Sequence, residues 1–197
     1  RFIEWSMGKT GQLTPVAIFD EVDTSDSYVT RASLHNLNIM RQILGPTPYV
    51  GEKVWMVRQN MIIPQLVRAE QRMESEDIHF ELPKVCPFCG EPTKIEDDFL
   101  YCTNPSCQGR IINRLDHYCS KKGLDIKGLS EATLEKLIDY GWVNSISDLY
   151  KLKEHRDKWV QKEGFGPKSV DNILSTIDER STNCELASFI SALSINR

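Results

Sequence analysis

The chain has 197 residues, of which 40% are hydrophobic and 26% are charged, and its formal net charge is −4. This composition excludes a wholly disordered or polybasic chain, and the length allows one medium domain or two to three small ones. No apolar run is long enough to cross a membrane and no signal peptide opens the chain, so no membrane partner is expected.

The first motif that suggests a chemical function is MGKTG, residues 7–11, whose three central residues match the end of a phosphate-binding P-loop. A P-loop also needs a glycine five residues before its Gly-Lys pair, and that position is Ile3. A helix should follow, whereas Leu13–Phe19 contains Pro15 and β-branched residues and predicts a strand. We therefore interpret the motif as a turn between two strands that carries one basic side chain, Lys9.

Residues 1–80 are predicted to form a small β-barrel. Apolar runs typical of strands lie at Val16–Phe19, Tyr28–Ala32, Val54–Val57 and Ile62–Val67. Between them, Leu34–Leu44 has apolar residues at helical spacing. Four to five strands with one inserted helix indicate a barrel of the OB type, with an SH3-like barrel as the alternative.

Residues 81–109 hold four cysteines with the spacing C-x2-C-x12-C-x4-C: Cys86, Cys89, Cys102 and Cys107. Two short cysteine loops supply the four soft ligands of a tetrahedral Zn²⁺ site, and such a closed set is structural rather than catalytic. The alternative, two disulfides, is disfavoured because no secretory signal is present. His117 and Cys119 lie close enough in the sequence to be alternative ligands, but they fall in a helical pattern. Cys184 is predicted to be a buried helix residue.

Residues 110–197 are predicted to be all-helical and to contain a repeat. Gly128–Ile138 aligns with Gly164–Leu174 at an offset of 36 residues, with apolar, small and hydroxyl-bearing positions in common. A helix is predicted before each copy, at Arg110–Lys121 and His155–Lys162, and another after it, where Pro167 suits a first helical position. This is the pattern of helix-hairpin-helix repeats.

The two hairpins of this pattern are the predicted DNA-phosphate contacts. Glycines allow close approach of the backbone, and the following helix offers unpaired N–H groups and a positive dipole end. Lysines beside them add salt-dependent, sequence-independent affinity. The residues concerned are Lys127, Gly128, Gly164, Gly166 and Lys168. The alternative is an ordinary αα-hairpin that ends a helix with glycine.

The order of OB-type barrel, four-cysteine zinc module and helix-hairpin-helix repeats, a multi-domain α+β fold, resembles the C-terminal half of bacterial NAD-dependent DNA ligase. The local matches are MGKTGQLTPVAIFDEV, RASLHN (31–36), VRQNMIIP (57–64) and GLSEATLEKLIDYGWVNSISDLYKL (128–152). Two departures stand out. Lys9 replaces the family's arginine, and Asn60-Met61 replace Gly-Asp, where asparagine still tolerates a left-handed turn.

The resemblance implies a cytoplasmic, monomeric bacterial enzyme that seals nicks in duplex DNA during replication and repair, using NAD and Mg²⁺. The family's Lys-x-Asp-Gly nucleophile motif is missing from this chain, so we expect it to supply DNA grip without ligating alone. Resemblance also implies that Lys9, Arg31 and Arg58 lie near the DNA backbone around the nick; the alternative is that they are solvated surface cations. Competing functions are a stand-alone zinc-stapled DNA-binding adaptor and a zinc-stapled protein-interaction scaffold.

Overall fold

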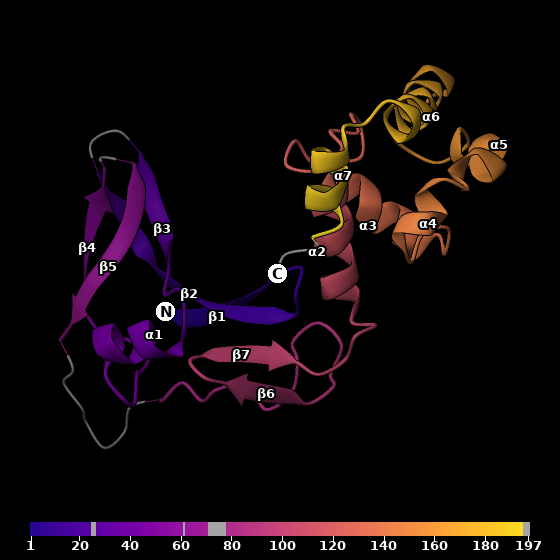
Figure 1. Ribbon diagram of the computed structural model, residues 1–197. Coiled ribbons are helices and arrows are strands. Elements are labelled where there is room, and N and C mark those ends of the chain that lie inside the picture. Colours follow the sequence, from indigo (N-terminus) through magenta and orange to yellow (C-terminus); the bar gives the residue numbers. More distant parts are fainter. Residues whose placement is uncertain (25–26, 61, 71–77, 195–197) are drawn as a thin grey trace. The chain divides into compact units, whose positions relative to one another are not determined.

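The computed structural model describes residues 1–24, 27–60, 62–70 and 78–194. Its contacts divide the chain into two compact units, Arg1–Cys107 and Gln108–Arg197 (Figure 1). The cysteine-rich segment falls within the first unit together with the N-terminal strands. The finer division into a barrel, a zinc module and a helical domain stays a prediction.

The first unit is built mainly from strands. Their bounds are β1 Phe2–Met7, β2 Gln12–Asp23, β3 Tyr28–Ser33, β4 Val54–Gln59, β5 Ile63–Ala69, β6 Thr93–Glu96 and β7 Phe99–Cys102. Each of the four runs predicted as strands lies in, or overlaps, one of them. The helix α1 spans Leu37–Leu44 and begins later than predicted, because the Asn36 side chain accepts a 2.8 Å hydrogen bond from the Ile39 amide and caps it.

The long strand β2 organises the larger sheet. It pairs antiparallel with β1 on one side and with β3 on the other. At its start it also pairs with β7, where Gln12 lies opposite Tyr101 and Leu13 opposite Leu100. The hairpin β6–β7, which carries the third cysteine, therefore extends the sheet of the N-terminal strands (Figure 1). A second sheet contains β4 and β5.

The core of this unit lies between the sheets and α1. Leu13, Leu34, Leu37 and Leu66 are almost completely buried there, because alternate strand positions and one helix face turn inward. Three of the four clustered cysteines belong to the same core. The sulfur cluster thus continues the hydrophobic interior of the first unit.

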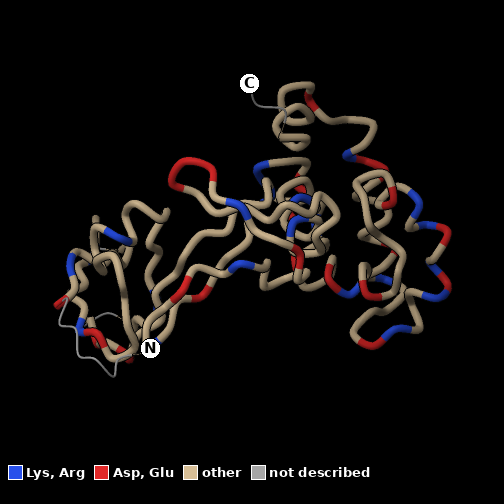
Figure 2. Tube along the Cα trace, turned by 90° about the horizontal axis from the view of Figure 1, so that it is seen from below, with Lys and Arg blue, Asp and Glu red and all other residues tan. Residues whose placement is uncertain are grey.

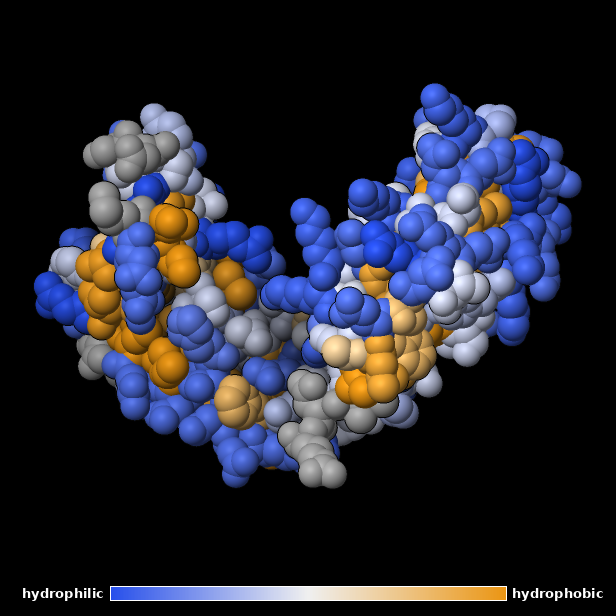
Figure 3. Space-filling view, turned by 45° about the horizontal axis from the view of Figure 1, so that its top comes forward, coloured by the Kyte–Doolittle hydropathy of each residue, from blue (hydrophilic) through white to orange (hydrophobic). Residues whose placement is uncertain are grey.

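One surface of the first unit keeps large apolar side chains exposed. On β4 and β5, Trp55 is 40% exposed and Ile63 is 56% exposed. Figure 3 shows hydrophobic side chains gathered on this unit's surface. The Arg68 guanidinium covers the Trp55 ring at 3.8 Å from its centroid, a cation–π contact that shields part of this area.

The second unit is helical. Its elements are α2 Gln108–Cys119, α3 Glu131–Asp139, α4 Ile146–Leu149, the 3₁₀ helix η1 Leu152–His155, α5 Arg156–Trp159, α6 Pro167–Thr182 and α7 Leu186–Ala192. Pro167 occupies the start of α6, as predicted. In place of the single helix predicted over His155–Lys162, η1 and α5 follow each other and end three residues earlier, at Trp159. None of the helices within the described residues is long and apolar enough to cross a membrane.

A single core holds these helices together. Tyr118, Leu134, Leu137, Trp159 and Val170 are fully buried in it and come from four different helices. The Tyr118 and Tyr150 hydroxyls are hydrogen-bonded to each other, so the tyrosine from α2 has a polar partner.

The prediction for Cys184 was wrong. The helix α6 ends at Thr182, with the Asn183 amide donating to the Glu179 carbonyl, and α7 begins only at Leu186. Cys184 lies in the connection between them and is half-buried. Cys119, by contrast, lies in α2 and is buried, and burial raises the pKa of its thiol to about 12.

Candidate metal centre and nucleic-acid interface

The four cysteines of the C-x2-C-x12-C-x4-C pattern converge on one point. The sulfurs of Cys86, Cys89, Cys102 and Cys107 all lie within 4.8 Å of one another. The Cys86 and Cys107 sulfurs are 3.9 Å apart, and those of Cys89 and Cys102 are 3.5 Å apart. A disulfide needs about 2.05 Å, whereas sulfurs around a tetrahedral Zn²⁺ at about 2.3 Å are roughly 3.8 Å apart. The donor set therefore fits a metal ion, and none of these four cysteines forms a disulfide.

Two tight turns place these sulfurs. In the first, the Gly90 amide donates to the Cys86 carbonyl at 2.9 Å and the Cys86 amide donates to the Glu91 carbonyl at 2.7 Å. In the second, the Cys107 amide donates to the Asn104 carbonyl at 3.2 Å. Because β7 ends at Cys102, its pairing with β2 fixes where the second turn begins.

The ionisation of these thiols depends on their crowding. For Cys89, burial opposes ionisation, but hydrogen bonds from the Glu91 backbone and the neighbouring thiols outweigh it and lower the pKa to about 7. For Cys102, burial raises the pKa to about 12, and the nearby sulfurs add to that effect. Several thiolates cannot share so small a volume unless a cation offsets their repulsion. A bound metal meets that requirement.

The two alternative ligands suggested by the sequence, His117 and Cys119, do not belong to this cluster. His117 is on α2 and its Nε2 contacts the Ser191 carbonyl oxygen at 3.0 Å. Cys119 is buried in the helical core. The four cysteines alone form the candidate centre within the described residues.

Lys9 lies in a turn between two strands, as predicted. The Gly8 amide donates to the Gln12 carbonyl at 2.8 Å, and β2 follows directly, where a P-loop would need a helix. The Gly11 carbonyl accepts a 2.9 Å bond from the Cys102 amide, so this turn is tied to the cysteine centre. The Lys9 side chain is half-buried.

Arg31 and Arg58 each have partners within the protein. Arg31, on β3, forms a 2.9 Å ion pair with Glu4 across the sheet, and both side chains are exposed. Arg58, on β4, donates to the hydroxyls of Thr24 and Ser27 and so holds the end of the β2–β3 hairpin. These two cations therefore have structural contacts as well as surface positions.

The three barrel cations follow the length of β2. Lys9 precedes the strand, Arg31 lies opposite Ile18, and Arg58 contacts the residues just after its end. From Gln12 to Ile18 the strand spans roughly 20 Å at about 3.3 Å per residue. The three residues are thus placed at different points along β2.

The substitution at Asn60 behaves as expected. Its φ is 52°, in the left-handed region that asparagine tolerates. The Ile62 amide donates to the Gln59 carbonyl at 3.2 Å and closes the turn between β4 and β5. Met61 lies outside the described residues.

The repeat found in the sequence is also a repeat of backbone geometry. Gly128 has a φ of 92° and Gly164 a φ of 84°, values that favour glycine. Each lies three residues before a helix, since α3 begins at Glu131 and α6 at Pro167. The residues with predicted phosphate contacts, Lys127, Gly128, Gly164, Gly166 and Lys168, are all exposed.

The two copies differ at the helix cap. Ser130 caps α3, and its hydroxyl accepts from the Thr133 amide at 3.4 Å. The equivalent cap of α6 is Gly166, and no heavy atom of the described residues lies within 4 Å of the position a Cβ would take there. Gly128 has a further reason to be glycine, because a Cβ there would lie 2.6 Å from Cγ1 of Ile173. The second hairpin is the more open one.

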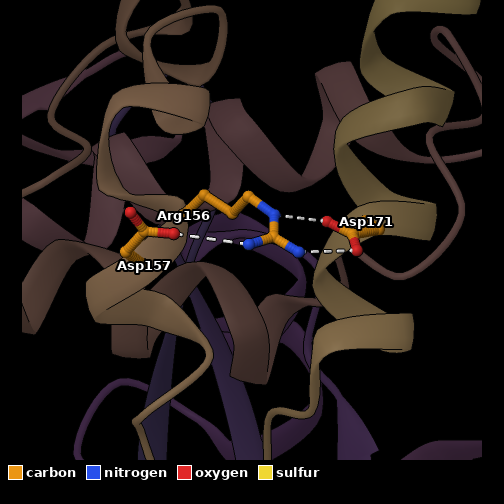
Figure 4. Close-up of polar contacts among 3 residues, drawn as sticks. All are labelled: Arg156, Asp157 and Asp171. Carbon is orange, nitrogen blue, oxygen red and sulfur yellow. Dashed lines mark hydrogen bonds and ion pairs between the residues drawn. The ribbon is translucent and has the colours of Figure 1, made fainter.

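Charges of both signs are interspersed along the helical unit (Figure 2). The best-defined pair joins α5 to α6, where Arg156 donates to both Asp171 oxygens at 2.6 and 2.8 Å and also contacts Asp157 at 3.3 Å (Figure 4). The hydrogen bond from Arg156 lowers the pKa of Asp171, and the same contact raises the pKa of Arg156. This arginine is engaged in holding two helices.

Sequence reasoning missed a second constellation in the helical unit. Aromatic, cationic, acidic and amide side chains line an open surface cavity of about 520 Å³: Asp139, Tyr140, Trp142, Lys158, Gln161 and Lys162. The indication was present in the segments DYGW (139–142) and KWVQK (158–162), which interleave aromatic and basic residues. It went unnoticed because the two segments are separated by helices α4 and η1.

These features define a multi-domain α+β protein whose strand-rich unit holds a candidate four-thiolate metal centre and whose helical unit carries two similar glycine hairpins. Residues 1–78 match the family model of the NAD-dependent DNA ligase OB-fold domain. The OB-type prediction is thereby confirmed. The chain is 41% identical to a DNA ligase of Lachnoclostridium phytofermentans over 98% of this chain and 29% of the relative.

Two further relatives give the same result. DNA ligases of Thermomicrobium roseum and Fusobacterium nucleatum are 36% and 34% identical over 99% and 98% of the chain. The chain spans less than a third of the length of each of these relatives. Nearly the whole chain thus matches one segment of these DNA ligases, and its first 78 residues match the OB-fold domain of the NAD-dependent ones.

Proposed function

We propose that this chain is the DNA-gripping segment of an NAD-dependent ligase that seals nicks in duplex DNA. The observation that carries the proposal is the pair of hairpins: Gly128 and Gly164 have the same left-handed backbone and the same distance to a following helix. They occur in a chain whose first 78 residues match the ligase OB-fold domain.

The hairpins would bind the sugar–phosphate backbone as helix-hairpin-helix elements. Unpaired amides at the start of α6 and its positive dipole end favour a phosphate oxygen, and Gly166 leaves the approach open. Lys168 adds a charge that the salt dependence of binding should report. The first hairpin is the weaker one, since Ser130 already satisfies one amide of α3. Contacts of this kind position the protein without reading sequence.

The barrel would add a second line of phosphate contacts along β2. Lys9, Arg31 and Arg58 are spread over this strand, which suits a surface that follows a DNA backbone. Arg31 would exchange its exposed partner Glu4 for a phosphate at little cost, because exposed ion pairs are weak. Arg58 would also act by keeping the β2–β3 hairpin in place.

Zinc is the metal that best suits the cysteine centre. Four thiolates are the closed ligand set of structural Zn²⁺ sites, and they leave no position for a reacting water. When bound, zinc supplies a cross-link between the two cysteine turns and takes no part in the reaction. Its role would be to hold β6–β7 against β2, next to the Lys9 turn.

The chemistry of ligation would lie elsewhere in the enzyme. The chain contains no Lys-x-Asp-Gly motif, so it lacks the family's nucleophile for adenylylation. NAD and Mg²⁺ would serve the whole enzyme, and this segment alone should bind nicked DNA without joining it.

Binding to nicked and to intact duplex over a salt series tests the proposal. Salt-sensitive binding that favours the nick supports it, and Lys9, Arg31 and Arg58 can then be replaced singly to find the contacts at the nick. Absence of binding to either duplex at low salt would contradict it and favour the protein-interaction scaffold.

A further inference from the structure

The cavity between the end of α3 and α5 combines two features that a nucleotide requires. Tyr140 and Trp142 provide aromatic surface, and Lys158 and Lys162 provide positive charge. Gln161 can both donate and accept hydrogen bonds, and Asp139 can accept them. A planar base that carries a phosphate group would match this combination.

The aromatic residues are held in place before any ligand arrives. The Trp142 indole is stacked on the His155 ring, with centroids 4.9 Å apart and planes within 2°. Tyr140 meets Trp142 at 54° with its centroid 4.9 Å away. Lys162 lies over the Tyr140 ring at 4.5 Å, a cation–π contact that keeps its ammonium group near the cavity. A preorganised set of side chains loses little conformational entropy on binding.

The two lysines and the glutamine of the lining take no part in the core, and Tyr140 and Trp142 pack against it without being fully buried. Lys158, Gln161 and Lys162 are exposed, and Tyr140 and Trp142 are half-buried, while Val143 and Trp159 beside them fill the interior. Two lysines face one carboxylate in the lining, which leaves the cavity with an excess of positive charge. That balance favours an anionic ligand over a cationic one.

We propose that this cavity binds an unpaired nucleotide of a single-stranded DNA segment, with the base against Tyr140 and Trp142 and the phosphate near Lys158 and Lys162. The interaction differs from the duplex contacts of the hairpins because it depends on the base. It does not rest on the proposed role at nicks: a single-stranded end could bind here whether or not the hairpins bind duplex.

The test compares binding of the chain to a short oligothymidylate and to an oligomer of equal length made of abasic sites. Because base–aromatic stacking is lost with the bases, we expect at least about fivefold weaker binding of the abasic oligomer. Trp142→Ala should abolish this difference, and Trp142→Phe should keep most of it. Replacing both Lys158 and Lys162 by alanine should weaken binding of both oligomers. Lys153→Ala, an exposed lysine outside the lining, is the matched control.

Equal binding of the two oligomers by the unmodified chain would overturn the proposal, as would a base preference that survives Trp142→Ala. A Lys168→Ala variant separates this site from the hairpins. It should weaken duplex binding and leave the preference for bases over abasic sites unchanged. Duplex binding that Lys168→Ala leaves unchanged would count against the hairpins and not against this cavity.

Discussion

The cores of the two units of this protein are built from different kinds of side chain. In the strand-rich unit, Cys86, Cys102 and Cys107 are part of the buried core, so sulfur ligands occupy space that hydrophobic side chains fill elsewhere. In the helical unit, the core is formed by aromatic and aliphatic side chains around Trp159. Metal dependence should therefore be confined to one unit, although both units belong to one chain of ordinary composition.

Removal of the metal should have the largest effect and should act on the first unit. Cys107→Ser, or treatment with a strong chelator, should disorder β6–β7 and their pairing with β2, because structural zinc contributes on the order of 10 kcal/mol to small sites. Helix signals of the second unit should persist. Metal analysis together with amide NMR signals of Leu100 and Leu134 would follow both units.

Cys184→Ser is the control for this experiment, since Cys184 lies outside the cluster. It should retain the metal and both sets of signals. Retention of the β6–β7 signals after the metal is gone would show that the two cores are less different than described.

Removal of a buried side chain from the helical core should have the next largest effect and should leave the metal centre intact. Leu134 is fully buried, so Leu134→Ala should lower the free energy of unfolding of the second unit by about 2–5 kcal/mol. Leu186 is 74% exposed, and Leu186→Ala should change this free energy of unfolding by less than about 0.5 kcal/mol. Chemical denaturation followed by circular dichroism measures both. A metal content that falls in Leu134→Ala would break the separation of the two units.

Replacement of the hairpin glycine should have an intermediate effect. Gly128→Ala and Gly141→Ala both force alanine into a left-handed backbone, at a cost of about 1 kcal/mol or more. Only at Gly128 would the new Cβ also meet Ile173, whereas no described heavy atom lies within 4 Å at Gly141. Thermal unfolding should therefore show a larger loss for Gly128→Ala. Equal losses would mean that Ile173 moves aside without cost.

The exposed ion pair between α5 and α6 should have the smallest effect. The partner Arg156 lowers the pKa of Asp171, so the pair's contribution is present above the ordinary aspartate pKa of about 3.9. It should disappear as the pH falls through the lowered value. Asp171→Asn should remove this pH dependence, and high salt should weaken it. An NMR titration of the Asp171 carboxyl measures the shift, and an ordinary pKa there would contradict the pairing seen in Figure 4.

Much of this architecture follows from local patterns in the sequence. The cysteine spacing predicted the sulfur cluster, and the glycine repeat predicted two backbone turns of the same kind, because both depend on residues close together in the chain. The pairing of β7 with β2 could not be predicted from the sequence, since it joins residues about ninety positions apart. The contact between Gly128 and Ile173 and the Trp142 cavity depend likewise on tertiary packing.

For Cys184, in contrast, a local pattern gave a wrong prediction. An apolar type suggested a buried helix residue, but the break between α6 and α7 falls at that point. The break has no proline or glycine to mark it.

The central claim is that the glycine hairpins bind DNA phosphates, and the salt dependence of duplex binding tests it most directly. The slope of log affinity against log salt should be compared for the unmodified chain, a Lys127→Gln/Lys168→Gln variant and a Lys153→Gln control. Because each phosphate contact adds about 0.9 to the slope, the double variant should lose roughly 1.8 and the control nothing. An unchanged slope in the double variant would contradict the claim.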